Sequence, residues 1–165
     1  PGGKSVYASE LADIEITSCD IYEHRLELIK AYADRMKEKS INVMLNDATQ
    51  YNDAFYCSFD KVLCDVPCSG LGVAGKKPDI YLRSSMQKVL ELSEVQYKIL
   101  SNASKYVKPQ GRLVYSTCTT LREENYNVVG KFVKDNQSWR VLRHENFLPD
   151  GKGCDGFFIA VLERK

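Results

Sequence analysis

The sequence lacks the features that would place it in a membrane, in an oxidising compartment or around a metal. No apolar run reaches the roughly 18 residues that a membrane-spanning helix needs, and Pro1–Lys4 does not have the pattern of a signal peptide. The six cysteines are too few for a disulfide scaffold of 165 residues. Cys64 and Cys68 have no second close pair, and His24 and His144 stand alone, which argues against zinc. We therefore expect a soluble, cytoplasmic protein with reduced thiols and no metal.

A strong excess of one charge is also absent. The formal net charge is +1 and the isoelectric point is near 8.0, below the value of about 9 that is typical of nucleic-acid-binding domains. Contacts with RNA must then come from a local cluster of cations or from another domain. The local candidates are Lys76, Lys77, Arg83, Lys88 and Arg122, and an ordinary solvated surface is the alternative for all of them.

Strand-like apolar runs alternate with helical patterns along the chain. We predict strands at 14–20, 41–45, 59–65, 112–117, 139–142 and 156–162. Three helices are predicted. In the first, Leu26, Ile29, Ala33 and Met36 share one face. The second covers 85–107, with Met86, Val89, Leu90, Tyr97, Leu100 and Ala103 at helical spacing, and the third covers 123–134. This alternation predicts one α/β domain over residues 1–165, with a largely parallel, doubly wound sheet. In such sheets ligands bind at the carboxyl ends of the strands.

A first group of candidate residues suits a nucleotide-like cofactor. Asp20 ends a predicted strand shortly after a glycine pair, and a carboxylate there can accept hydrogen bonds from two ribose hydroxyls. Gly2 and Gly3 allow a ligand to approach the backbone closely. Asp47, two residues beyond the next strand, could accept from an adenine amino group. A helix-capping role for Asp20 and an exposed loop position for Asp47 remain open alternatives.

A second group contains an acid and two thiols. The segment Asp65–Gly70 directly follows a predicted strand, and Pro67 stiffens the turn that leads to Cys68. Cys118 closes the next predicted strand. If the two strands are parallel neighbours, about 4.8 Å apart, both thiols face one cleft. This arrangement suggests a nucleophile, whereas Cys19, Cys57 and Cys64 fit the ordinary role of small core residues.

In order and spacing these motifs resemble the RNA 5-methylcytosine methyltransferases, most closely the bacterial branch that modifies small-subunit ribosomal RNA. The shared residues are Pro1–Lys4, Asp20 with Arg25-Leu26, Asp65–Gly70, Pro78–Ile80, Ser116–Thr119 followed by Glu124-Asn125, and Asp155–Phe158. The resemblance implies a Rossmann-like fold with an antiparallel C-terminal strand, S-adenosylmethionine (SAM) as cofactor and RNA, most of all ribosomal RNA, as partner. It assigns Gly2, Gly3 and Lys4 to the SAM loop, Asp20 and Arg25 to the ribose, Asp47 to the adenine and Asp65 to the reaction centre beside SAM.

By the same resemblance Cys118 is the nucleophile and Cys68 assists product release. Thiolate addition at carbon 6 of cytosine would make carbon 5 nucleophilic enough to take the SAM methyl group. An acid near ring nitrogen 3, for which Asp65 is placed, would stabilise the developing charge. Loss of the carbon-5 proton, to Cys68 or to a water that it positions, would then expel Cys118. Lys76, Lys77 and Arg83 are expected to hold flanking phosphates.

The sequence departs from that family at its start. Family members carry a strand before the glycine turn, and an RNA-binding domain further upstream. We expect the missing strand to leave two open strand edges, and the chain on its own to be an inactive, N-terminally truncated catalytic domain. Two rival interpretations are a nucleotide triphosphatase, since Gly3-Lys4-Ser5 matches the end of a phosphate loop without its upstream glycine, and a non-catalytic RNA-binding module.

Overall fold

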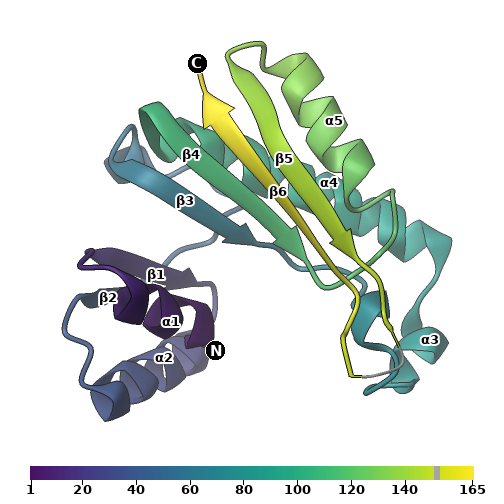
Figure 1. Ribbon diagram of the computed structural model, residues 1–165, viewed down its shortest axis with the longest axis horizontal. Helices are drawn as coiled ribbons and strands as arrows, with labels where there is room; N and C mark the ends of the chain where they lie inside the picture. Colours follow the sequence, from purple (N-terminus) through teal and green to yellow (C-terminus); the bar gives the residue numbers. More distant parts are fainter. Residues whose placement is uncertain (151–152) are drawn as a thin grey trace. The chain divides into compact units, whose positions relative to one another are not determined.

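The computed structural model describes residues 1–150 and 153–165, and in it helices and strands alternate much as predicted (Figure 1). The chain divides into two compact units, residues 1–48 and residues 49–165. Each unit has its own sheet. Within the described residues, no helix is both long enough and apolar enough to span a bilayer.

The smaller unit is built from two helices and two parallel strands. Its elements are α1 (Gly3–Leu11), β1 (Ile16–Asp20), α2 (Glu23–Met36) and β2 (Ile41–Leu45), and Asp20 pairs with Leu45 at the carboxyl end of the sheet. The predicted buried face of α2 is correct for Leu26, Ile29 and Ala33. The prediction is wrong for Met36, which is 40% exposed because the helix ends there and the backbone turns left-handed at Lys37.

The larger unit has a four-stranded sheet with helices on one face. Its strands run in the order β3-β4-β6-β5, with β3 parallel to β4 and β6 antiparallel to both of its neighbours. Helices α4 and α5 cover one face (Figure 1). The elements are η1 (Asp53–Phe55), β3 (Phe59–Asp65), η2 (Leu71–Val73), α3 (Asp79–Arg83), α4 (Met86–Tyr106), β4 (Val107–Thr117), α5 (Tyr126–Asp135), β5 (Trp139–Phe147) and β6 (Phe157–Arg164).

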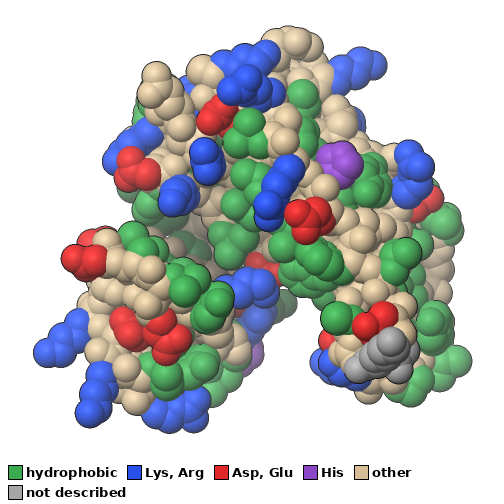
Figure 2. All heavy atoms as spheres, viewed as in Figure 1, with side chains coloured by type: hydrophobic (Ala, Val, Ile, Leu, Met, Phe, Trp, Pro, Cys, Tyr) green, Lys and Arg blue, Asp and Glu red, His purple; other side chains and the backbone are tan. Residues whose placement is uncertain are grey.

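The core of the larger unit lies between the sheet and helices α4 and α5. Leu113, Tyr115, Phe158, Ala160 and Leu162 are fully buried on that face, as are Leu100 of α4 and Phe132 of α5. Each large apolar side chain buried this way stabilises the fold by about 1.5–3 kcal/mol. On the opposite face Leu63, Val114 and Val161 lie in register and are less buried. Figure 2 shows apolar side chains between basic ones across the larger unit.

Three differences from the predicted elements matter for the site. Strand β4 begins at Val107 rather than at 112, because residues 108–111 bulge out opposite Asp60 in the β3–β4 ladder. Helix α5 begins at Tyr126 rather than at 123, because the side chains of Glu124 and Asn125 turn into the core. Helix α4 buries Val89 and Leu100, whereas Met86 and Leu90, predicted on the same face, are 57% and 53% exposed. Helices α1 and α3 were not predicted.

The expected open strand edges are present in the described part of the chain. Strand β1 pairs only with β2, and β3 pairs only with β4. The expected antiparallel C-terminal strand is confirmed as β6, which lies between β4 and β5. That residues 1–165 act as one catalytic domain stays a prediction.

Candidate active site

The two thiols predicted to share a cleft are in contact in the larger unit. Strands β3 and β4 are parallel neighbours, with Asp65 opposite Ser116 at their carboxyl ends. Cys68 follows β3 and Cys118 follows β4, and their Sγ atoms lie 3.0 Å apart. The Cys118 backbone N–H also donates to Cys68 Sγ over 3.2 Å. The parallel pairing therefore brings together two residues 50 positions apart in the sequence.

The contact shifts the pKa values of the two thiols in opposite directions. The hydrogen bond from Cys68 lowers the pKa of Cys118 from 9.0 to about 7, against partial burial and the charges of Asp65 and Glu124, which raise it. The same hydrogen bond, burial and the charge on Cys118 raise the pKa of Cys68, and together they outweigh the backbone N–H groups that lower it. The direction of these shifts makes Cys118 the more acidic thiol of the pair, and a thiolate is the nucleophilic form of cysteine.

Two glycines allow the loops that carry the thiols to approach one another. The Gly72 N–H donates to the Cys118 carbonyl over 3.0 Å, and the Gly156 N–H donates to the Gly72 carbonyl over 2.7 Å. A Cβ atom on Gly72 would collide with the Gly156 carbonyl group and lie 2.8 Å from the Cys118 oxygen. Three loops therefore meet at backbone distance beside Cys118.

Asp65 stands at the end of β3, as predicted. The Ser116 hydroxyl donates to its Oδ1 over 3.3 Å, and the residue is exposed. Its charge is one of those that raise the pKa of Cys118, so the carboxylate lies within electrostatic reach of the thiol. An exposed carboxylate at this position could meet a polar ring atom of a bound base.

The candidate ribose-binding residues lie together in the smaller unit. Asp20 ends β1, where its Oδ2 pairs with Arg25 Nη1 over 3.2 Å and its Oδ1 accepts the Tyr22 N–H over 3.1 Å. The capping alternative is not observed, because the N-cap of α2 is Tyr22 and that end has no side-chain cap. Asp47 is exposed two residues beyond β2, at the same carboxyl end of this sheet as Asp20.

The glycine pair begins helix α1. Gly2 is its N-cap with φ +93°, a backbone conformation that side chains disfavour, and a Cβ atom added there would lie 3.4 Å from the Cα atom of Ile29 in α2. Gly3 and Lys4 form the first turn, and a hydrogen bond of 3.0 Å joins Ser5 to Ser18 of β1. The backbone N–H groups at the start of a helix favour acidic or polar ligand atoms. With the carboxylates of Asp20 and Asp47 at the strand ends, these residues fit the charged and hydroxyl groups of SAM.

Two of the five cations suggested for RNA form surface ion pairs among the described residues. Lys76 Nζ lies 2.8 Å from Asp155 Oδ2, and Arg83 Nη2 lies 3.4 Å from Asp79 Oδ2. Lys77 is exposed beside them. Exposed pairs of this kind contribute about 0–1 kcal/mol, so a phosphate could displace the acidic partner. Their role with RNA stays a prediction.

Sequence reasoning did not assign a role to several polar residues that surround the thiols. Glu124, Asn125 and Gln96 are fully buried. The Asn125 side chain accepts from Thr117 Oγ1 over 2.6 Å and donates to the Thr119 carbonyl over 2.9 Å, which fixes the turn that carries Cys118. The sequence offered one indication of their importance: Glu124-Asn125 belongs to a motif shared with the RNA methyltransferases.

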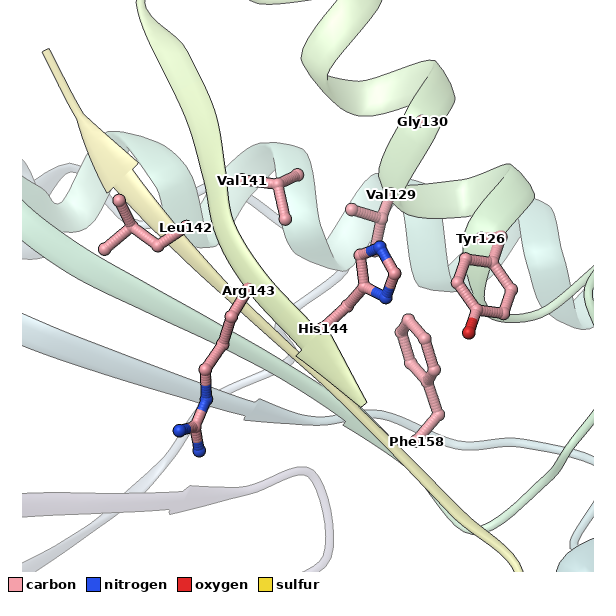
Figure 3. Close-up of a pocket in the computed structure, with 8 residues that line it drawn as sticks. All are labelled: Tyr126, Val129, Gly130, Val141, Leu142, Arg143, His144 and Phe158. Atoms are coloured by element: carbon pink, nitrogen blue, oxygen red, sulfur yellow. The ribbon is translucent and has the colours of Figure 1, made fainter. Parts of the chain in front are cut away.

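A groove of about 550 Å³ lies between α5 and β5, and none of the described residues that line it is a cysteine, an aspartate or a glutamate (Figure 3). In Figure 3 the His144 ring lies beside Phe158 and Tyr126. The His144 and Tyr126 ring centroids are 5.1 Å apart, edge to face. The groove is therefore distinct from the thiol pair in its chemistry.

Comparison with known proteins places the chain in a family. The family model described as "16S rRNA methyltransferase RsmB/F" matches residues 1–163, which makes the chain part of a methyltransferase family. The chain belongs to this family. It is 36% identical, over its full length, to the probable ribosomal RNA small subunit methyltransferase B of Bacillus subtilis, and 32% identical to the corresponding protein of Proteus mirabilis.

Solved structures agree with the family and the fold. NSun6 from Pyrococcus horikoshii, solved with SFG, superposes with a TM-score of 0.89 and 27% identity over 99% of this chain and 45% of its own. A methyltransferase homologue from the same organism superposes with a TM-score of 0.82 and 27% identity, over 100% of this chain and 59% of its own. The chain spans 41% and 39% of the two curated relatives, about two fifths of their length.

Proposed function

We propose that the protein carrying this chain transfers a methyl group from SAM to carbon 5 of a cytosine in small-subunit ribosomal RNA, in the cytoplasm. The observation that carries the proposal is the Cys68–Cys118 contact of 3.0 Å at the ends of two neighbouring parallel strands. Membership of the RsmB/F family supports the ribosomal substrate. Neither a nucleotide triphosphatase nor a non-catalytic RNA-binding module, the two rival interpretations, would need this pair of thiols.

Cys118 is the nucleophile in this proposal. Its thiolate forms a bond to carbon 6 of the ring, and the electrons of the carbon 5–carbon 6 double bond shift toward ring nitrogen 3. Asp65, at the end of the adjacent strand, stabilises or protonates that position. SAM, when bound, supplies the electrophilic methyl group that carbon 5 then takes.

Cys68 serves the release step. While Cys118 is a thiolate, its charge and its hydrogen bond keep the proton on Cys68. Once Cys118 is bonded to carbon, both influences disappear and the pKa of Cys68 falls. The Cys68 proton can then pass to solvent. The Cys68 thiolate, or a water that it holds, takes the carbon-5 proton, the C–H electrons re-form the carbon 5–carbon 6 double bond, and Cys118 leaves carbon 6 as a thiolate.

SAM is held, in this proposal, by Gly2, Gly3 and Lys4 at the start of α1 and by Asp20, Arg25 and Asp47 at the β1–β2 edge, with Asp65 on the reacting side. The target base must leave its stack to reach Cys118, at a cost of a few kcal/mol that a loop or single strand reduces.

The product identifies the reaction. The full-length protein, incubated with SAM and unmodified small-subunit ribosomal RNA, should yield 5-methylcytidine on nucleoside mass spectrometry. Cys118→Ala should yield none, and Cys154→Ala, which changes an exposed cysteine elsewhere in the unit, should yield as much as the wild type. A methyl group found on an exocyclic nitrogen or on ribose would contradict the proposal, since neither position needs a thiol.

A further inference from the structure

Glu124 is a fully buried carboxylate that binds the loop carrying Cys68. Its Oε1 accepts the Ser69 N–H over 2.8 Å, and its Oε2 accepts the Ser69 hydroxyl over 2.5 Å. Oε1 also accepts from Gln96 Nε2 over 2.9 Å. A buried carboxylate is costly unless donors surround it, and here three donors do so. Two of the three come from the residue that directly follows Cys68.

Two further buried side chains, Gln96 and Tyr115, continue this hydrogen-bond network around Cys68 and Cys118. Gln96 of α4 also donates to the Pro67 carbonyl over 2.8 Å, on the other side of Cys68. The Tyr115 hydroxyl, on β4, contacts Gln96 Oε1 at 3.2 Å and donates to the Glu124 carbonyl at 2.5 Å. The residues before and after Cys68 are thus both fixed to buried side chains, one on α4 and one in the turn beyond Cys118.

We propose that Glu124 is a positioning residue, which holds the Cys68 loop so that the Cys68 thiol donates to Cys118. Its catalytic consequence rests on the proposed function, whereas the thiol geometry itself can be measured in the free protein. The Ser69 hydroxyl oxygen also lies 3.1 Å from Thr119 Oγ1, so the loop that carries Cys68 contacts the turn that carries Cys118 directly as well as through Glu124. Without Glu124, the Ser69 N–H and Gln96 would lose their acceptor and the loop would move.

Two substitutions of Glu124 distinguish its positioning role from an effect of its negative charge on Cys118. The titratable groups that act on Cys118 are Cys68 and Asp65 from the β3 side and Glu124 from the turn after β4. In Glu124→Gln one oxygen can still accept from Ser69 and Gln96, and the Ser69 hydroxyl can turn to accept from the new amide, so the loop stays while the charge is lost. In Glu124→Ala both the contacts and the charge are lost.

The two roles predict opposite signs for the pKa of Cys118. If Glu124 acts by its charge alone, removing a negative group lowers that pKa in both variants. If Glu124 positions Cys68, the alanine variant loses the hydrogen bond that depresses the pKa, which then rises from about 7 toward 9.0, while the glutamine variant stays near or slightly below the wild type. Glu123→Ala, which removes the adjacent carboxylate outside this network, is the matched control.

The experiment is the pH dependence of Cys118 alkylation by iodoacetamide in the full-length protein without RNA, followed by peptide mass spectrometry. We expect a midpoint near pH 7 for wild type, Glu123→Ala and Glu124→Gln, and a midpoint at least one unit higher for Glu124→Ala, with a roughly tenfold or greater fall in rate at pH 7. A midpoint that falls or stays unchanged in Glu124→Ala overturns the proposal. If Glu124→Ala does not fold, Ser69→Ala, which removes the hydroxyl contact alone, should show a smaller rise, and no rise would overturn it equally.

A second measurement connects the positioning to release and separates the two proposals. With RNA and SAM, Glu124→Ala should accumulate covalent protein–RNA adduct as Cys68→Ala does, and the double variant should accumulate no more than Cys68→Ala alone. Additive effects would overturn the positioning role. If the wild type forms neither adduct nor 5-methylcytidine while the alkylation midpoints shift as expected, the proposed function fails and the positioning role of Glu124 stands.

Discussion

Gly72 is the position where one added methyl group should disturb the thiol pair most. In Gly72→Ala the three atoms nearest the new Cβ would all be backbone atoms: the oxygen and carbon of the Gly156 carbonyl group, with the carbon 2.7 Å away, and the Cys118 oxygen at 2.8 Å. No side chain can rotate out of its way. The loops must separate instead, which breaks the hydrogen bonds from Gly72 to Cys118 and from Gly156 to Gly72.

The expected cost in the free energy of unfolding follows from these contacts. Two backbone hydrogen bonds contribute about 1–3 kcal/mol together, and overpacking a close contact costs about 1–3 kcal/mol more. A loss of about 2–6 kcal/mol is large against the roughly 5–15 kcal/mol that stabilise a typical domain. Gly75→Ala is the matched control, because an added Cβ there meets no atom within 4 Å, and we expect a change of at most about 0.5 kcal/mol.

Trp139 provides the assay. It is the single tryptophan, 4% exposed, and its ring centroid lies 6.0 Å from that of Phe132 within the larger unit. Its fluorescence during urea unfolding should show a clearly lower midpoint for Gly72→Ala than for Gly75→Ala, with similar slopes. Equal midpoints for the two variants would refute the close approach of the three loops.

Three further predictions concern the cofactor, the thiols and helix α5. Asp20→Ala in the full-length protein should weaken SAM binding by about 1.5–3 kcal/mol in calorimetry. Asp13→Ala, at an exposed position outside the site, should leave the affinity for SAM unchanged. Equal affinities of the two variants would show that Asp20 does not bind SAM. One equivalent of hydrogen peroxide should join Cys68 to Cys118 as a disulfide, with two molecules of water formed and a mass loss of about 2 Da, because the sulfur atoms are 3.0 Å apart; sulfinic acid on Cys118 beside a free Cys68 would contradict that geometry. Gly130→Ala should raise the free energy of unfolding by up to about 1 kcal/mol, since the added methyl meets no atom within 4 Å and alanine favours the helix. A lower urea midpoint than the wild type would contradict the open surroundings of that residue.

The sequence was sufficient for the parts of the site that depend on strand order. Strands β2 and β3 have the predicted bounds, and the meeting of Cys68 and Cys118 required only that two successive strands be parallel neighbours. Asp20 and Asp65 were likewise placed at strand ends by the alternation of apolar runs. These features follow from periodicity, which local sequence determines.

The buried polar groups could not be predicted in the same way. A glutamate is ordinarily exposed, and Glu124 is buried only because donors from Ser69 and Gln96, distant in the sequence, surround it. The late start of α5 has the same cause, since a helix beginning at 123 would compete with that inward orientation. The early start of β4 depends on the bulge at 108–111, where Gly111 allows Asp60 to approach.

The most direct test of the account is to trap and locate the covalent bond to RNA. The full-length Cys68→Ala variant, incubated with SAM and small-subunit ribosomal RNA, should give a protein–RNA band that survives denaturing electrophoresis, and mass spectrometry should place the nucleotide on Cys118. The Cys118→Ala and double variants should give no such band. A band that persists in Cys118→Ala and disappears in Cys68→Ala would show the two roles reversed, and unchanged turnover in both single variants would contradict the thiol mechanism.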